Sequence, residues 1–480
     1  MTERPGAVAR DYAPFHAGYV WAALGLALFP GFALGAHLAS VLAFGFPIRE
    51  GFVSFVQTHG HVQLVGWAGL FILGISLHFI PRLAGAPLGR PQWIPRILAA
   101  VAGGLMLRSI AHPMLPYASG WARGLLGILV AASALSEAVG IAASVLLVVE
   151  TMHRARRAGE RPALHIVQPF FGMMTAGWAI YAALDLLLAI RMAASGSTVL
   201  DPAWNRFAIA AFISLVLLPV AFGFSVRLLP LYLRLPKPDW PVRATAQAYL
   251  AAVALELGPP LASLVKAGNY LPSVWSSLGE AFKGVVVLWF VWNLGLRNRR
   301  RLPWTVQRTL DPGPDRRPTG EGLPDYGEFG RFERLIYSAY LWLVTGAVLD
   351  AGSGVSFMAG HGGAISGDAV RHLYLLGFVT HLILGMSVRM IPGFVQKRRV
   401  ASPALVDATF WLGNAALVCR VMPLLLPASM VLAVPGLADT LGAMFGVSGI
   451  LGMFAVGCLA VNLWKTIRQP DTPPRNPSSH

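Results

Sequence analysis

Residues 58–84 read THGHVQLVGWAGLFILGISLHFIPRLA, an apolar stretch with two histidines near its start and a third before its closing proline. It is longer than the roughly 20 apolar residues that a transmembrane helix needs. A histidine inside such a helix is costly unless it is paired, hydrated or bound to a metal. The stretch therefore predicts a membrane helix with a polar site near one end.

The same pattern occurs again in two later segments. In residues 371–392 the steps from the histidine are identical, which aligns His61 with His372, Gly66 with Gly377, Trp67 with Phe378, Gly74 with Gly385, Ser76 with Ser387, His78 with Arg389 and Pro81 with Pro392. A weaker third copy keeps this register in Gly223, Ser225, Arg227 and Pro230, with Ala210 in place of the histidine. Internal repeats of this kind predict pseudo-symmetric packing.

The composition is that of a polytopic membrane protein. Of 480 residues, 55% are hydrophobic and only 12% are charged, so polar residues are too few to cover a soluble surface. The formal net charge is +16, but the basic residues fall in short clusters between apolar segments. Such clusters are typical of membrane proteins, so we expect membrane lipid as a partner and no nucleic acid.

The spacing of apolar segments predicts an all-α integral membrane protein with about twelve transmembrane helices in three pseudo-symmetric four-helix units. The helices should begin near residues 17, 59, 93, 121, 165, 207, 244, 272, 334, 370, 404 and 437. We interpret residues 1–480 as one membrane domain, with repeat unit one at 17–150, unit two at 165–296, a Pro-, Gly- and Arg-rich cytoplasmic linker at 297–333, and unit three at 334–466. The three copies of the opening pattern fall on helices two, six and ten.

Basic residues gather in every second loop, for example in residues 153–161, 234–243 and 397–399. The positive-inside bias places these loops in the cytoplasm, with both termini on the same side. We expect a multi-pass protein of a bacterial-type inner membrane. With this topology, helices two, six and ten run from the outside to the inside.

The histidines fall in layers along the predicted helices. At 1.5 Å per residue, the 17 residues from His61 to His78 span about 25 Å, so these two histidines cannot serve one site. The outer layer holds His37, His59, His61, Arg108, His112, His361, Arg371 and His372, and His381 lies near the middle of the membrane. Histidine rings at the outer end of a helix can also reach the membrane interface without binding a ligand. The recurrence of histidine at one repeat position favours a ligand-binding role for His61 and His372.

Two further groups of residues have more than one reading. His59 lies about 200° around the helix from His61 and should face elsewhere. Four acidic residues within spans could relay protons, or pair with Arg191, Lys266 or other bases: Glu137, Asp185, Glu256 and Asp350. The sequence contains no motif for soluble hydrolase or nucleotide-driven chemistry.

The opening stretch resembles the double-histidine helix of haem-copper oxidase subunit I proteins, which reads His-x-His, then glycine, then a late His-x-x-Pro. Over the whole chain the sequence is most similar to the NnrS family of that superfamily. The residues that carry this resemblance are Tyr12-Ala-Pro-Phe15, His59 with His61, Arg227-Leu-Leu-Pro230, and His372 at the start of helix ten.

The resemblance implies a membrane protein with haem, b-type by expectation, and copper, involved in the response to nitric oxide. It implies His61 and His372 as axial haem ligands, and His59 as a ligand of a second metal or haem. Arg108 and Arg371 could hold the haem propionates, although interface charges explain them equally well. His37, His112 and His381 complete the set of candidate metal ligands.

Two other functions stay open from the sequence. Oxidases and nitric oxide reductases bind a second metal with histidines on helices six and seven, whereas residues 207–267 contain none. A redox enzyme would therefore need an unorthodox site near His59, His112 and His381. A transporter for copper or a small anion, using Arg227 and Arg389, is the alternative from a different class.

Overall fold

The computed structural model describes residues 12–157, 163–233, 238–270, 272–296, 328–361 and 365–470. All regular secondary structure in these ranges is helical, and twelve helices there are long and apolar enough to cross a membrane. The predicted all-α fold with twelve spans is confirmed. The division into three four-helix units stays a prediction, and residues 297–327 of the expected linker lie outside the described ranges.

The spans are formed by consecutive helical elements. In chain order these are α1 (Gly18–Leu26), η1 (Ala27–Phe32), α2 (Ala33–Phe44), η2 (Arg49–Gly51), α3 (Phe52–His61), η3 (Val62–Gly69), α4 (Leu70–Ala84), η4 (Pro91–Trp93), α5 (Ile94–Met114), η5 (Leu115–Tyr117), α6 (Gly120–Arg157), η6 (Ala163–Ile166), α7 (Gln168–Ser195), α8 (Pro202–Phe212), η7 (Ile213–Leu217), α9 (Leu218–Tyr232), α10 (Val242–Ala267), α11 (Val274–Leu294), α12 (Phe332–Met358), α13 (Gly367–His372), η8 (Leu373–Thr380), α14 (His381–Phe394), α15 (Pro403–Leu425), α16 (Ala428–Ala433) and α17 (Leu437–Arg468).

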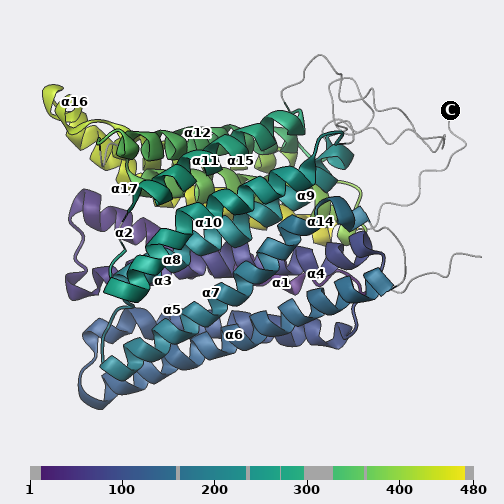
Figure 1. Cartoon of the computed structure of the whole chain (residues 1–480), viewed down its shortest axis with the longest axis horizontal. Helices are drawn as coiled ribbons and strands as arrows, with labels where there is room; N and C mark the ends of the chain where they lie inside the picture. The colour runs from purple at the N-terminus through teal and green to yellow at the C-terminus, as the bar shows by residue number, and fades with distance from the viewer. Residues whose placement is uncertain are drawn as a thin grey trace, which may run out of the picture.

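The helices lie side by side in an elongated bundle (Figure 1). Helices α5, α6 and α7 form one side of the view and α11, α12 and α15 the other, while α3, α4 and α14 run between them. The starts of α3 and α8 lie toward the end that carries α16, here named the α16 end, and α4, α9 and α14 lie toward the opposite end. The basic-loop pattern predicts that the α16 end faces outward.

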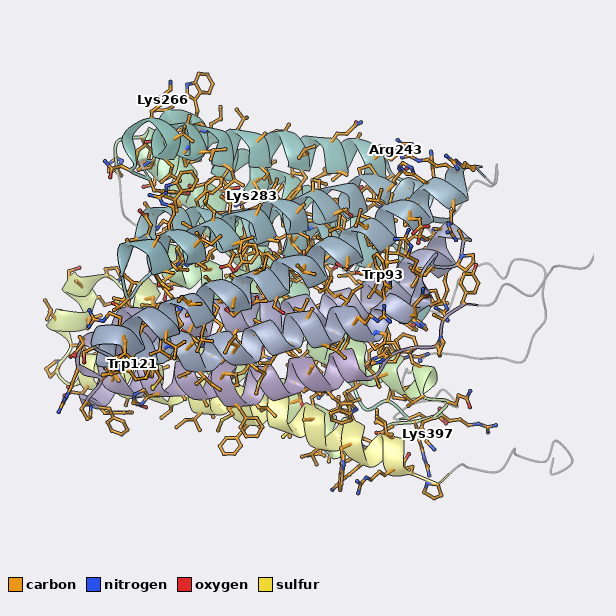
Figure 2. All side chains as sticks on the ribbon, turned by 90° about the horizontal axis from the view of Figure 1, so that it is seen from below. Trp93, Trp121, Arg243, Lys266, Lys283 and Lys397 are labelled. Atoms are coloured by element: carbon orange, nitrogen blue, oxygen red, sulfur yellow. The ribbon has the colours of Figure 1, made fainter. Side chains whose placement is uncertain are left out.

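Large apolar side chains cover the outside of the bundle. Trp121 is 82% exposed and Leu432 is 83% exposed, which water would disfavour and lipid would accept. Figure 2 shows Trp121 at one end, and Trp93 with Arg243 and Lys397 at the other, as expected for side chains at the two membrane interfaces. The chain is a multi-pass membrane protein.

The second span begins earlier than the sequence predicted. It runs from Arg49 to Ala84, whereas hydrophobicity placed its start near residue 59. Backbone hydrogen bonds continue the helix through α3, which carries polar side chains such as Ser54 and Gln57 that are buried against other helices. Because hydropathy averages over a window, it detects the apolar part of a helix and misses a polar extension that packs inside the protein.

The three helices that carry the repeated pattern each contain a π-helical segment. The segments η3 and η8 begin directly after His61 and His372, and η7 begins at Ile213. A π-helical turn widens the helix and changes the direction in which later side chains point. The two repeat histidines therefore stand at the junction between two helical registers.

The repeated glycines allow neighbouring helices to approach closely. A Cβ atom on Gly74 would lie 2.5 Å from the Cβ of Tyr19, and one on Gly385 would lie 2.8 Å from a methyl group of Ile336. Both distances are far below van der Waals contact, so any larger residue would push the helices apart. Close contact between membrane helices through small residues is a general source of their association.

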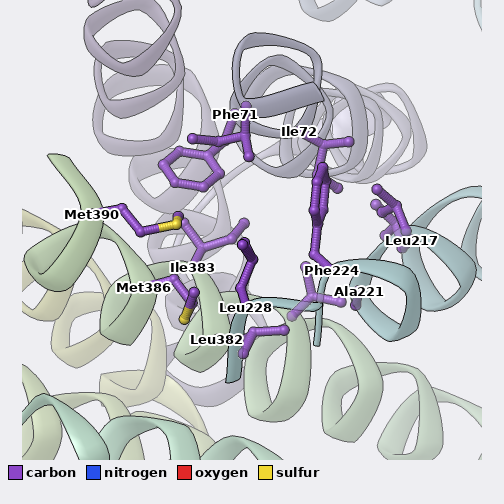
Figure 3. A pocket seen from close by; sticks show the side chains of 13 residues that line it. Phe71, Ile72, Leu217, Ala221, Phe224, Leu228, Leu382, Ile383, Met386 and Met390 are labelled. Atoms are coloured by element: carbon purple, nitrogen blue, oxygen red, sulfur yellow. The ribbon is translucent and has the colours of Figure 1, made fainter. Parts of the chain in front are cut away.

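A cavity of about 60 Å³ lies where the spans containing α4, α9 and α14 meet (Figure 3). Its lining is apolar and includes Phe71, Phe224, Ile383, Met386 and Met390. None of the histidine or carboxylate groups described below lines it. It is therefore part of the packing between the central helices, and the polar sites lie elsewhere.

Candidate cofactor and metal sites

The first polar site surrounds His61 and is named the His61 cluster: His61 on α3, Arg108 and His112 on α5, Glu137 on α6, and Tyr181 and Asp185 on α7. The Nε2 atom of His61 donates to Glu137 Oε2 at 2.8 Å. Its Nδ1 atom lies 3.0 Å from the Tyr181 hydroxyl and 3.7 Å from Asp185 Oδ1. Both ring nitrogens of His61 are thus directed at α6 and α7.

The α5 side of this cluster contributes a buried arginine and a buried histidine. Arg108 is 0% exposed and donates through an Nη atom to Asp185 Oδ2 at 2.8 Å. His112 is also 0% exposed and lies one helical turn further along, near Arg108, His61 and Asp185. An unpaired arginine at this depth would be very costly, so the ion pair with Asp185 explains how α5 tolerates it.

The second polar site surrounds His372 and is named the His372 cluster: His59 on α3, Asp368, Arg371 and His372 on α13, and Arg420 on α15. The Nδ1 atom of His372 donates to the Asp368 carbonyl oxygen at 2.8 Å, and its Nε2 accepts from Arg420 Nε at 3.2 Å. Arg371 donates to Asp368 Oδ1 at 3.1 Å. Two cations therefore surround one carboxylate and one imidazole.

His59 belongs to this second cluster and not to the first. It lies near Arg420, Asp368 and His372. Its Nδ1 donates to the Gly31 carbonyl at 2.9 Å, and the ring packs on Gly35, where a Cβ would come within 2.6 Å of it. The two histidines of the opening motif thus face different sides of the helix.

His59 and His372 share one feature that His61 lacks. In both, Nδ1 donates to a backbone carbonyl, which leaves the lone pair on Nε2; in His372 this lone pair accepts from Arg420 Nε. Metal-bound histidines usually have their second nitrogen anchored in this way, because the anchor fixes the tautomer and the ring orientation. The geometry therefore favours Nε2 of these two rings as cofactor ligands.

The other predicted ligands lie apart from both clusters by their contacts. His37 packs beside Phe55, with ring centroids 6.2 Å apart. His381 is 0% exposed, donates through Nδ1 to the Leu376 carbonyl, and has Nε2 pressed against Gly413. His361 is exposed. The contacts of His59, His112 and His381 therefore do not converge on one shared site.

A third polar site contains no histidine and is named the Lys283 cluster: Glu256 on α10, Lys283 on α11, Asp350 on α12 and Tyr374 on η8. Lys283 Nζ lies 2.6 Å from Glu256 Oε1 and 2.9 Å from Asp350 Oδ2. Tyr374 donates to Asp350 Oδ2 at 2.9 Å. Figure 2 shows Lys283 between the two ends of the bundle.

The sequence pointed to Glu137, Asp185, Glu256, Asp350 and Arg108 as candidates, but not to which residues pair with one another. Asp185 pairs with Arg108, and Asp350 with Lys283, whereas Arg191 and Lys266 are exposed. Lys283, Asp368, Tyr181 and Arg420 were not among the candidate site residues. A lone basic residue within an apolar span, such as Arg420 in Pro403–Leu425, is the signal that could have found two of them.

Comparisons with known proteins locate the fold but not the family. No family model matches the chain, and no curated protein matches it in sequence. Among solved structures it is similar to a haem-copper terminal oxidase, solved as a dimer, with a TM-score of 0.61 and 13% identity over 95% of this chain and 85% of that one. At this identity the likeness shows the fold alone: the chain has the fold of a haem-copper terminal oxidase.

The donor set of the His372 cluster fits a haem. His59 offers an Nε2 lone pair, as haem iron requires, and His372 would offer one once Arg420 moves off its Nε2. Arg371 and the displaced Arg420 could then pair with carboxylate groups. Gly35 leaves room for the His59 ring where a side chain would displace it. The donor types of this cluster therefore match those that haem iron and haem propionates use.

Proposed function

We propose that this chain is an integral membrane haem protein whose haem is held by His59 and His372. The observation that carries the proposal is the common anchoring of these two rings, each with Nδ1 on a backbone carbonyl. The oxidase-like fold supports it independently. Bound haem supplies one-electron transfer, and its iron would bind a diatomic gas once one of the two histidines dissociates.

The remaining residues of the His372 cluster hold and tune the ligands. The Asp368 carbonyl fixes the His372 ring, and its carboxylate draws Arg371 and Arg420 toward the same place. Arg420 in turn lies over the Phe445 ring, at 4.1 Å from its centroid. Two arginines held this way could neutralise haem propionates without either moving far.

We propose nitric oxide as the gas that this protein handles. The support is the resemblance to the NnrS family, carried by residues 12–15, His59 with His61, Arg227 with Pro230, and His372. Anaerobic addition of nitric oxide to the reduced protein should displace one of the two histidines and give a nitrosyl haem spectrum. Stoichiometric binding without turnover would indicate a carrier or sensor, whereas consumption of nitric oxide with a reductant would indicate an enzyme.

The ligand assignment is tested by the reduced-minus-oxidised optical spectrum of purified protein produced with a haem supply. We expect a six-coordinate haem signal in the wild type that His59→Ala or His372→Ala removes or converts. His61→Ala is the matched control, because it removes the neighbouring ring of the same motif and should leave the signal in place.

Two results would contradict this proposal. Wild-type protein without haem would refute it entirely and would favour the transporter. Loss of the signal in His61→Ala with retention in His59→Ala would instead establish His61 and His372 as the axial pair implied by the family resemblance.

A further inference from the structure

The His61 cluster plays no part in the proposed haem site, yet it gathers metal-binding groups. His61, Glu137 and Asp185 each offer one ligand atom, and these atoms all lie within 4.8 Å of one another. They come from three different helices, α3, α6 and α7, and all three residues are buried. A single ion could therefore contact all of them with small side-chain movements.

The same cluster contains buried hydrogen-bonding atoms that have no partner. Among the described residues, the following buried atoms of the cluster have no hydrogen-bond partner: both ring nitrogens of His112, Oε1 of Glu137, and Nε and one Nη of Arg108. The Thr198 backbone lies near His112, but without hydrogen-bond geometry. Buried polar groups are normally paired, so a group of unpaired ones indicates an occupant that completes the site.

The charges of the cluster call for one more cation. Glu137 and Asp185 supply two carboxylates, and Arg108 supplies one guanidinium. One negative charge therefore remains among these three residues, and a bound cation would offset it.

The local packing makes room for the acidic ligand. A Cβ atom on Gly104 of α5 would lie 2.6 Å from Cγ of Glu137 and 2.7 Å from the Ser133 carbonyl oxygen. Glycine at this position therefore lets Glu137 lie directly against α5, on the helix that carries Arg108 and His112. The close approach of α5 and α6 at Gly104 therefore holds the Glu137 carboxylate inside the bundle.

We propose that the His61 cluster is a non-haem metal site, with His61, Glu137 and Asp185 as ligands and with the unpartnered ring of His112, which lies outside the 4.8 Å group, turning in as a fourth. Two imidazoles and two carboxylates suit a divalent ion of borderline softness, such as iron(II), zinc or manganese. Arg108 is a positioning residue, because it holds Asp185 in place through the 2.8 Å ion pair. The site is separate from the haem proposed at His59 and His372.

The test is metal binding by chelator-treated, full-length protein in detergent, titrated separately with Zn²⁺, Fe²⁺ and Mn²⁺ and followed by elemental analysis after desalting. We expect about one ion per chain in addition to haem iron. Asp185→Asn, Glu137→Gln and His112→Ala should each weaken binding at least about 10-fold, by analogy with losses at known sites. The matched control is Glu256→Gln, an equally buried carboxylate of the Lys283 cluster, which should bind as the wild type does.

The haem spectrum of each variant separates this proposal from the proposed function. Glu137→Gln keeps the shape of the side chain, and an unchanged haem spectrum and elution profile will show that it folds. Failure of the wild type to retain any of the three ions would overturn the metal site while leaving the haem proposal intact. Equal affinity in wild type and His112→Ala would remove His112 from the ligand set.

Discussion

The His61 and Lys283 clusters are built from similar parts but are completed differently. Each contains a buried aspartate paired with a basic residue, Asp185 with Arg108 and Asp350 with Lys283, at 2.8 and 2.9 Å. Each adds a glutamate and a tyrosine. The difference is that two histidines complete the first cluster, whereas the second has none.

That difference changes what the centre of each cluster can hold. The ammonium of Lys283 sits between Glu256 and Asp350 and bonds to both, so it occupies the position that a metal ion would take. Of the described side chains in that cluster, only Glu256 has an unpartnered buried atom, Oε2. In the His61 cluster, Arg108 bonds only to Asp185, and the group that contacts both acids is the His61 ring. A lysine therefore bridges the acids of one cluster, whereas an imidazole, which can bind a metal, bridges those of the other.

The largest expected effect comes from removing the central cation. Lys283→Met leaves Glu256 and Asp350 buried and uncompensated, which should destabilise the protein by about 3–5 kcal/mol. Thermal unfolding in detergent would measure it, with the exposed Lys266→Met as control. A Lys283→Met variant as stable as the control would show that the Lys283 cluster is not held together by its ion pairs.

The second prediction concerns stabilisation by metal. If the His61 cluster binds metal and the Lys283 cluster does not, Zn²⁺ at 100 times its dissociation constant should raise the free energy of unfolding of the wild type by about 2.7 kcal/mol. Asp185→Asn should lose most of this gain, and the structurally corresponding Asp350→Asn should keep it. Equal gains in both variants would mean that zinc binds elsewhere.

The smallest effects should come from the two tyrosines. Tyr374→Phe removes a 2.9 Å hydrogen bond to Asp350 and should cost about 1.5–3 kcal/mol, as for bonds to charged groups. Tyr181→Phe should cost less, because His61 Nδ1 still lies 3.7 Å from Asp185. Thermal unfolding of both variants, with and without Zn²⁺, would show which substitution costs more stability. A larger loss in Tyr181→Phe than in Tyr374→Phe would contradict the view that His61 Nδ1 can use either Tyr181 or Asp185 as its partner.

Much of the fold could be predicted from the sequence because membrane insertion depends on local composition. The first, third and fourth spans begin at Gly18, Pro91 and Gly120, close to the predicted 17, 93 and 121. The second span differs most, since its first turns are polar and are stabilised by contacts such as Gln57 with the Leu200 backbone. Those contacts join residues more than a hundred positions apart, which no local window detects.

The candidate sites were predictable only in part. His61 and His372 were candidates because they occupy the same position of the repeat. The acidic residues were candidates because charged residues are rare within membrane spans. Which residues meet depends on how each helix is rotated about its axis, and the π-helical segments after both histidines alter that rotation. The pairing of His59 with the His372 cluster, and of Asp185 with Arg108, could not be read from spacing alone.

The sequence by itself determined that this chain crosses the membrane about twelve times and that histidines gather toward one end of its repeated helices. Hydrophobic length and periodic spacing are properties of single segments, so they can be recognised without knowing which segments pack together. Only the tertiary structure decided that the two histidines of one motif belong to different clusters, and that a lysine bridges the acids of one cluster while a histidine bridges those of another. Those outcomes depend on atoms from separate helices meeting within about 3 Å, which is a property of packing and not of any one segment.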